Sequence, residues 1–129
     1  MKTKFSINWL SSIQPRKQRK YRFNASLHTK GTFLSARLSK ELTEKHKTRN
    51  VRVRTGDKVL IMRGQFKGVT GLVERVDLSR ERINVAGATI SKKDGSKVAY
   101  PIHPSNVQIT SLKEDKKRFK KVSETKEKK

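Results

Sequence analysis

Short apolar runs separated by turn residues fill the middle of the chain. Lys58–Met62 and Val69–Val76 are rich in Val, Leu and Ile and flank a glycine-containing segment. Arg82–Val85 and Asn106–Thr110 alternate apolar and polar residues, the pattern of half-buried strands. Two further strands flank Asp94-Gly95, a dipeptide suited to a tight hairpin turn because both positions tolerate positive φ. Five or six short strands in about sixty residues predict a small, mainly β barrel.

The flanks of this region have a different pattern. The segment Ser39–His46 predicts one short helix, because its serine can cap the first turn and Leu38 and Leu42 can share a face. Residues 15–23, PRKQRKYRF, form a basic run that ends in two aromatic residues. Residues 113–129 have mixed charge and almost no apolar content, so we expect them to be disordered without a partner.

Charge follows the same division of the chain. The net charge is +22, from 33 Lys+Arg against 11 Asp+Glu. Residues 1–54 carry +13, residues 55–112 carry +4 and residues 113–129 carry +5. We therefore predict a basic extension over 1–50 containing the short helix, a barrel over 51–112 and a charged tail over 113–129. Such a charge repels itself unless a polyanion is near. Nucleic acid is the first candidate, and an anionic membrane surface is the second.

The residue types also exclude several functions. The chain has no cysteine, which excludes disulfides and Cys-based zinc sites. The histidines His28, His46 and His103 are isolated, so surface or capping roles are favoured over a metal site. Residues 1–20 lack a cleavable signal pattern, and no apolar run is long enough to cross a membrane. We expect a soluble intracellular protein with no cofactor, metal or catalytic residues.

The glycines around Lys67 raise the question of a nucleotide-binding loop. A P-loop places its lysine after the last glycine and continues into a helix. Here Lys67 precedes Gly68, and the chain continues through Gly71 into a predicted strand. The dinucleotide-binding fingerprint is absent as well. A structural role fits better: Gly68 allows positive φ in a turn, and Gly71 relieves crowding where a strand bends.

Several blocks of the sequence together carry a resemblance to known proteins. They are Gly56-Asp57-Lys58-Val59, Arg63-Gly64-Gln65-Phe66-Lys67-Gly68-Val69-Thr70-Gly71, Val73, Val76, Pro15-Arg16-Lys17-Gln18-Arg19-Lys20, Ser39-Lys40-Glu41-Leu42 and Pro101-Ile102-His103-Pro104-Ser105-Asn106-Val107. The glycine segment resembles the KOW motif, and the blocks on both sides of it extend the resemblance to about residues 13–118. Together they resemble the family of large-subunit ribosomal proteins numbered twenty-four in bacteria and archaea and twenty-six in eukaryotes, in its archaeal type.

The resemblance implies an SH3-like barrel that binds the 5′ domain of large-subunit rRNA, beside neighbouring large-subunit ribosomal proteins in the cytoplasm. It also implies an early role in subunit assembly and a position near the polypeptide exit tunnel. The chain departs from the family at Asn24-Ala25-Ser26-Leu27-His28, where the family usually has proline in place of Ser26. Residues 1–12 match no part of the family pattern.

We predict structural RNA binding by cations, glycines and an aromatic residue of these segments. Arginines of the basic run make bidentate phosphate contacts, and its lysines act as point charges. Tyr21 and Phe23 either stack on unpaired bases or pack against the protein. The candidate residues are Arg16, Lys17, Arg19, Lys20, Tyr21, Arg22, Lys30, Arg37, Arg52, Arg54, Arg63, Gly64, Lys67, Gly68, Lys92 and Lys93.

Three alternatives differ in partner or chemistry. A transcription or chromatin KOW protein usually carries a separate α/β domain, and none fits before residue 50. A membrane-surface protein needs a stronger amphipathic helix than Phe5, Ile7, Trp9 and Leu10 provide. An RNA-processing enzyme needs a catalytic set, which the sequence does not show.

Overall fold

Strands dominate the structure, a computed structural model that describes residues 11–115, 118 and 119. Its helices are α1 (Pro15–Asn24), α2 (Leu27–Phe33), α3 (Lys40–His46) and the 3-10 helix η1 (Pro104–Asn106). Its strands are β1 (Ser35–Leu38), β2 (Asn50–Arg52), β3 (Lys58–Ile61), β4 (Thr70–Asp77), β5 (Arg82–Ser91), β6 (Lys97–Ile102) and β7 (Val107–Ser111). The predicted mainly β class is confirmed. In the described part of the chain, no helix is both long and apolar enough to cross a membrane.

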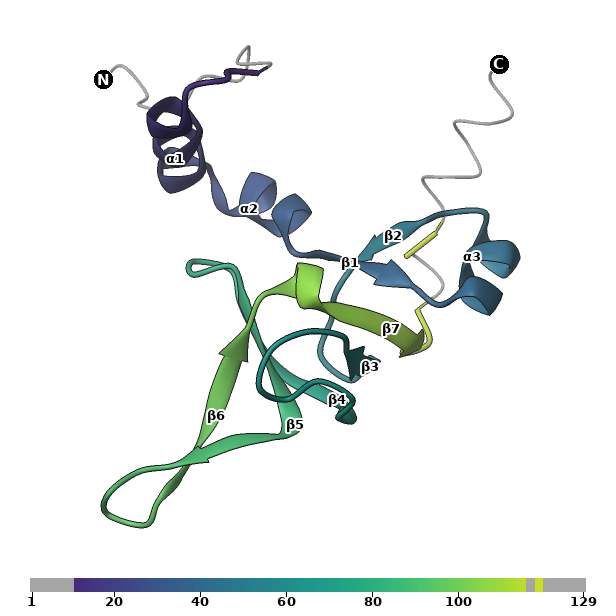
Figure 1. Cartoon of the computed structure of the whole chain (residues 1–129). Helices are drawn as coiled ribbons and strands as arrows, with labels where there is room; N and C mark the ends of the chain where they lie inside the picture. Colours follow the sequence, from purple (N-terminus) through teal and green to yellow (C-terminus); the bar gives the residue numbers. More distant parts are fainter. Residues whose placement is uncertain (1–10, 116–117, 120–129) are drawn as a thin grey trace.

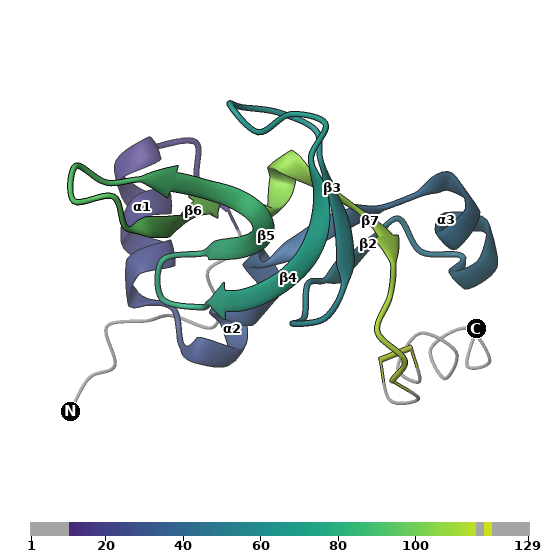
Figure 2. The same cartoon turned by 90° about the horizontal axis from the view of Figure 1, so that it is seen from below.

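These strands belong to one seven-stranded sheet in the order β2-β1-β7-β3-β4-β5-β6. Every neighbouring pair is antiparallel except β1 and β7, which run parallel with Arg37 beside Gln108. Helices α1 and α2 precede the sheet, and α3 lies at the opposite end of the molecule from the β5–β6 hairpin (Figures 1 and 2). The basic N-terminal helix and the hairpin tip are thus both distant from α3.

The core consists of the inward-facing residues of these strands. Val59, Ile83 and Ile109 have no exposed surface, and Leu34 and Leu38 bring the N-terminal segment into the same cluster. The alternation of buried and exposed residues along β3 and β7 follows from the opposite directions of successive strand side chains. Phe66, predicted as a core residue, is half-buried and packs against the edge of this cluster.

Most of the strands expected in the middle of the chain are present. β3, β4 and β7 lie at the predicted positions, and β5 and β6 flank the Asp94-Gly95 turn as expected. One detail was wrong: Arg82–Val85 and the strand before the turn form a single strand, β5. Gly87 has a φ of +88° within β5, where the register with β6 shifts. A bulge of this kind lets one strand bend and continue where the sequence suggests two.

The N-terminal region is more ordered than predicted. The helix near Ser39 is confirmed as α3, and the Ser39 hydroxyl accepts a hydrogen bond from Leu42 N at 3.4 Å. Helices α1 and α2 and strands β1 and β2 were not predicted. Pro15 begins α1, and the Arg, Lys and Gln residues that follow are good helix formers. Ser26 adopts φ −65°, the value that proline would impose, so the turn between α1 and α2 forms without proline.

The structural roles predicted for two glycines are confirmed. Gly68 has a φ of +88° and donates its N–H to Ile61 O at 2.8 Å, which closes the loop between β3 and β4. Gly71 in β4 faces β5 so closely that an added Cβ would overlap Ala86 O and lie 3.1 Å from the carbon of the same carbonyl. A neighbouring strand backbone cannot move aside without breaking its own hydrogen bonds.

The replacement Gly71→Ala is therefore expected to destabilise the protein by about 1–3 kcal/mol, the usual cost of overpacking. Urea denaturation followed by far-UV circular dichroism would measure this change. Glu74→Ala, at an exposed position of the same strand, is the control and should change the free energy of unfolding by less than about 0.5 kcal/mol. Equal stability of the two variants would contradict the proposed close contact.

Candidate nucleic-acid interface

Helix α1 presents an uncovered basic face. It holds five Arg or Lys residues among ten, has no acidic residue in its first turn and has no buried residue. The spacing i, i+3, i+4 and i+7 places Arg16, Arg19, Lys20 and Phe23 on one side of the helix. All four are exposed, and Phe23 is 82% exposed. Three cations thus share one exposed helix face with an aromatic residue.

The other side of α1 packs on the protein. The half-buried Tyr21 ring meets Phe33 of α2 edge-on, with 6.2 Å between the ring centroids. The Arg22 guanidinium lies 5.3 Å from the centroid of the same Phe33 ring and 3.5 Å from a Glu81 carboxylate oxygen. These contacts fix the helix beside the turn between β4 and β5. Tyr21 therefore packs against the protein, whereas Phe23 remains exposed.

The loop between β3 and β4 carries four of the predicted residues. Arg63, Gly64, Lys67 and Gly68 are all exposed. Gly64 has a φ of +93°, and its carbonyl accepts the Lys67 N–H at 3.1 Å. No atom lies within 4 Å of an added Cβ at Gly64 or Gly68, so backbone conformation rather than crowding requires glycine here. The loop is a compact turn with two outward cations.

The tip of the β5–β6 hairpin carries another pair of lysines. Lys92 and Lys93 are exposed, and Lys92 N donates to Ser96 O at 2.9 Å. The Asp94 carboxylate accepts hydrogen bonds from the Ser96 hydroxyl at 2.7 Å and from Ser96 N at 2.9 Å, which lower the pKa of Asp94. The turn is therefore held in one shape while its lysines remain exposed.

The sequence predicts that the hairpin lysines contact RNA phosphates. Replacing both with alanine is then expected to lower the salt dependence of RNA binding, because each lost phosphate contact reduces the slope of log K against log salt concentration by about 0.7–0.9. Filter binding to large-subunit rRNA at several salt concentrations measures the slope. The matched control is Lys40→Ala/Lys45→Ala on the distant α3, where both lysines are exposed. An unchanged slope in the Lys92→Ala/Lys93→Ala protein would mean that the hairpin tip does not contact RNA phosphates.

The remaining cations that were predicted to bind RNA differ in their exposure and in their contacts with the protein. Lys30 is half-buried in the last turn of α2, and Arg37 is exposed on β1. The Arg52 guanidinium lies against the backbone of α2. A Cβ atom added to Gly31 would be 2.6 Å from the guanidinium carbon of Arg52. Arg54 forms an ion pair with Asp115. Arg52 and Arg54 are both exposed, but Arg52 lies against α2 and Arg54 is paired with a carboxylate.

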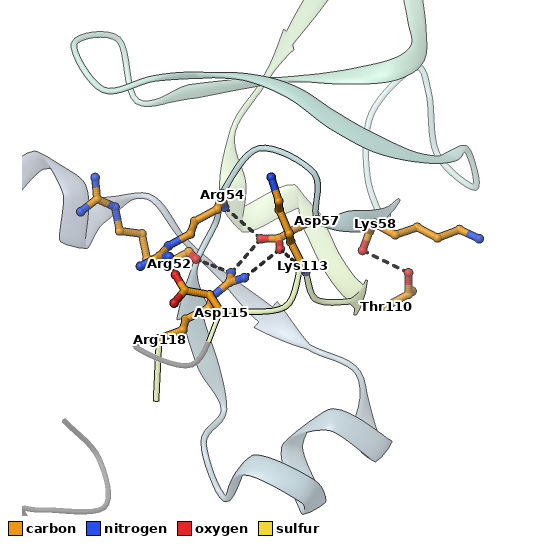
Figure 3. A network of polar contacts seen from close by, with 8 residues as sticks. All are labelled: Arg52, Arg54, Asp57, Lys58, Thr110, Lys113, Asp115 and Arg118. Carbon is orange, nitrogen blue, oxygen red and sulfur yellow. Dashed lines mark hydrogen bonds and ion pairs between the residues drawn. The ribbon is translucent and has the colours of Figure 1, made fainter. Parts of the chain in front are cut away.

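A buried ion pair, which the sequence did not reveal, joins the C-terminal segment to the sheet (Figure 3). The Asp57 carboxylate has no exposed surface and accepts two parallel hydrogen bonds from Arg118, at 2.8 and 2.7 Å. The backbone N–H groups of Arg54 and Lys113 donate to the same carboxylate at 2.9 and 3.0 Å. Arg118 also donates to Arg52 O at 2.6 Å.

These hydrogen bonds decide the ionisation of Asp57. Burial by itself raises the pKa of Asp57, but the hydrogen bonds from Arg118, Lys113 N and Arg54 N outweigh burial and lower it. The Arg118 side chain is only 3% exposed. The expected disorder of residues 113–129 is therefore wrong for residues 113–115 and 118–119, and the other residues of that tail lie outside the described part of the chain.

Two of the histidines have packing or capping roles. His103 precedes η1, and its Nδ1 atom accepts a hydrogen bond from Ser105 N at 3.3 Å, so the predicted capping role is confirmed there. The His46 ring stacks on Phe119 with 4.0 Å between centroids and an interplanar angle of 8°. Together with Arg118, this stacking holds the C-terminal segment against α3 and the sheet.

The sequence is similar to a family of known proteins. The family that comprises the eukaryotic ribosomal proteins L26 and their archaeal L24 counterparts matches residues 12–125. A curated relative, the large ribosomal subunit protein uL24 of Methanocorpusculum labreanum, is 47% identical over 103 residues, which cover 80% of this chain and 85% of the relative. Both findings confirm the predicted resemblance and the prediction of a ribosomal component rather than an enzyme. The chain therefore belongs to the family of eukaryotic L26 and archaeal L24 ribosomal proteins.

Proposed function

We propose that the protein is a structural constituent of the large ribosomal subunit and binds large-subunit rRNA directly. The uncovered face of α1 carries this proposal, because it combines three exposed cations with an exposed aromatic ring. Phosphate contacts supply most of the affinity of basic proteins for nucleic acid. RNA differs from duplex DNA in offering unpaired bases, which stack on aromatic side chains.

The residues of this face have complementary roles in the proposal. Arg16 and Arg19 present guanidinium groups that bind phosphate through two hydrogen bonds, and Lys20 supplies a point charge. Phe23 stacks on an unpaired base, a contact worth about 1–3 kcal/mol. Because Tyr21 and Arg22 fix the opposite side of the helix, the face is oriented before RNA binds and loses little entropy on binding.

The finer parts of the proposal rest on family membership. Residues 51–112 act as a KOW-type SH3-like barrel between the basic extension 1–50 and the tail 113–129. The protein binds the 5′ domain of the rRNA early in assembly, contacts neighbouring large-subunit proteins and lies near the polypeptide exit tunnel of cytoplasmic ribosomes. The name of the 47% identical relative, a large-subunit protein, supports the assignment to the large subunit.

Sedimentation of a native cell extract after a high-salt wash tests the proposal, with the protein detected by antibody. We expect recovery in the large-subunit peak, because loosely held basic proteins dissociate as salt rises. Recovery at the top of the gradient, or together with RNA polymerase, would overturn the proposal. Footprinting of the 5′ domain with the purified protein then tests direct contact with rRNA.

A further inference from the structure

A cavity of about 230 Å³ lies beside the β3–β4 loop, and none of its lining residues belongs to α1. It is bounded by that loop, by the end of β6, by η1 and by His103, which joins β6 to η1. Pockets for drug-sized ligands have volumes of roughly 300–1,000 Å³, so this one suits a single small group. None of its aromatic or η1 residues was among the candidates that the sequence suggested for RNA binding.

Two aromatic rings form part of the cavity wall. Phe66 of the loop and Tyr100 of β6 contact one another with 5.3 Å between centroids and an angle of 47°. Phe66 is anchored by packing on the core, whereas Tyr100 remains 38% exposed. A ring held by a packed neighbour but still exposed is a ready stacking surface, because it loses little entropy when a planar ligand arrives.

Charged and polar groups complete the lining. Arg63 and Arg82 bring two guanidinium groups, and His103 and Asn106 bring hydrogen-bonding side chains. Nδ1 of His103 lies 2.8 Å from the Ser105 hydroxyl and accepts a hydrogen bond from Ser105 N at 3.3 Å, and these two contacts fix the orientation of the ring. Burial, and then the positive charge of Arg82, lower the pKa of His103, which favours the neutral form of the ring at pH 7.

The cavity is preformed by backbone hydrogen bonds. Met62 N donates to Asn106 O at 2.7 Å and joins the loop to η1, while Asn106 N donates to His103 O at 3.0 Å. Within the loop, Val69 N donates to Phe66 O at 3.1 Å. The aromatic wall and the polar groups therefore hold fixed positions relative to one another.

We propose that this cavity binds one unpaired nucleobase of RNA, stacked on Tyr100 with its phosphate beside Arg63. The inference deepens the proposed function and rests on it. A simple anion would use the arginines but leave the aromatic wall unused. A purely apolar ligand would make no use of the exposed Arg63 guanidinium or of the Asn106 amide. A nucleotide satisfies both parts, because its base is planar with polar edges and its phosphate is an anion.

The test uses the full chain and large-subunit rRNA purified from the cells that produce the protein. Tyr100→Ala is compared with Tyr100→Phe and with Val98→Ala, whose side chain is 42% exposed on the same strand. We expect Tyr100→Ala to raise Kd roughly tenfold with an unchanged salt slope, because stacking releases no counterions. Tyr100→Phe and Val98→Ala should bind like the unmodified chain. Ultraviolet cross-linking of the unmodified complex should join a base to Phe66 or Tyr100.

The outcomes separate this inference from the proposed function. If the unmodified chain does not bind the rRNA, the proposed function fails. If it binds, but Tyr100→Ala has the same Kd and no cross-link reaches Phe66 or Tyr100, the cavity inference is wrong and the proposed function stands. An equal loss in Tyr100→Ala and Val98→Ala would indicate a general effect on the hairpin and would also overturn the inference. The cross-link requires no variant, so it tests base binding in the cavity even if Tyr100→Ala fails to fold.

Discussion

Replacing Arg16, Arg19 and Lys20 with alanine is expected to lower rRNA affinity on the order of a few hundredfold at 0.1 M salt. The logarithm of the binding constant falls linearly with the logarithm of the salt concentration. Each phosphate contact contributes about 0.7–0.9 to the slope, so three contacts contribute between about 2 and 3. Alanine favours helix, so α1 itself should persist. Filter binding across a range of salt concentrations measures both quantities.

The matched control removes three exposed cations from the opposite end of the molecule, through Lys40→Ala, Lys45→Ala and Arg49→Ala. Both triple variants have the same net charge, so a difference between them reports position rather than total charge. We expect the control to retain most of the slope. If both variants lose equal slope, binding depends on overall charge and α1 is not a defined contact surface.

Phe23→Ala separates stacking from charge on the same face. It should weaken rRNA binding by about 1–3 kcal/mol and leave the salt slope unchanged, because no phosphate contact is lost. Tyr21→Ala is no suitable comparison, since Tyr21 packs on Phe33 and its loss disturbs the helix itself. An unchanged Kd for Phe23→Ala would show that the exposed ring does not meet a base.

The replacement Asp57→Asn should destabilise the protein by about 3–5 kcal/mol, because it leaves the Arg118 guanidinium buried without a counter-charge. Both side chains are almost fully buried, so solvent does not screen this loss. Urea denaturation measured by far-UV circular dichroism gives the free energy of unfolding. The control is Glu44→Gln, which removes one exposed carboxylate on α3 and should change stability by less than about 0.5 kcal/mol.

A double-mutant cycle isolates the pair itself. Asp57→Asn combined with Arg118→Met should be less destabilised than the sum of the single variants, because the second change removes the unpaired charge created by the first. Simple additivity would show that the two side chains stabilise the fold independently. A cost for Asp57→Asn no larger than that of Glu44→Gln would show that the ion pair is dispensable.

The acid sensitivity of the protein gives a second measure of the same carboxylate. Because the folded-state pKa of Asp57 lies below its ordinary value of 3.8, its ionised form stabilises the fold above that pH. This contribution is lost as pH falls through the folded-state pKa. The stability difference between the unmodified chain and Asp57→Asn should therefore shrink as pH decreases below about 4. A difference independent of pH would contradict an ionised Asp57.

Patterns within short stretches of sequence predicted three strands, one hairpin and one helix correctly. Strands β3, β4 and β7 follow from short β-branched runs, the β5–β6 hairpin follows from Asp94-Gly95, and α3 follows from its serine cap. Helix α1 was missed because apolar periodicity is the main helical signal and this segment has little of it. Its remaining signals, Pro15 at the start and a run of good helix formers, describe propensity alone.

For the candidate site, too, some features could be predicted from local sequence and others could not. Charge and the glycine pattern predicted RNA contacts for the cations of α1, the β3–β4 loop and the hairpin tip, and the structure shows that these residues are exposed. The sequence could not predict which of the candidate side chains contact other parts of the protein. Arg52 lies against Gly31, Arg54 pairs with Asp115, and Tyr21 packs on Phe33. Those contacts depend on which elements meet in space.

Composition, local turns and motif residues were sufficient to predict the mainly β class and the family, and the net charge of +22 favoured a polyanionic partner. The tertiary structure alone decided that β1 pairs in parallel with β7, that Arg118 reaches Asp57, and that Phe66 meets Tyr100 in a shared cavity. Each of these pairs joins residues 30 or more positions apart in the chain. Such contacts form only when the sheet brings distant strands into register, and no local pattern of residues encodes them.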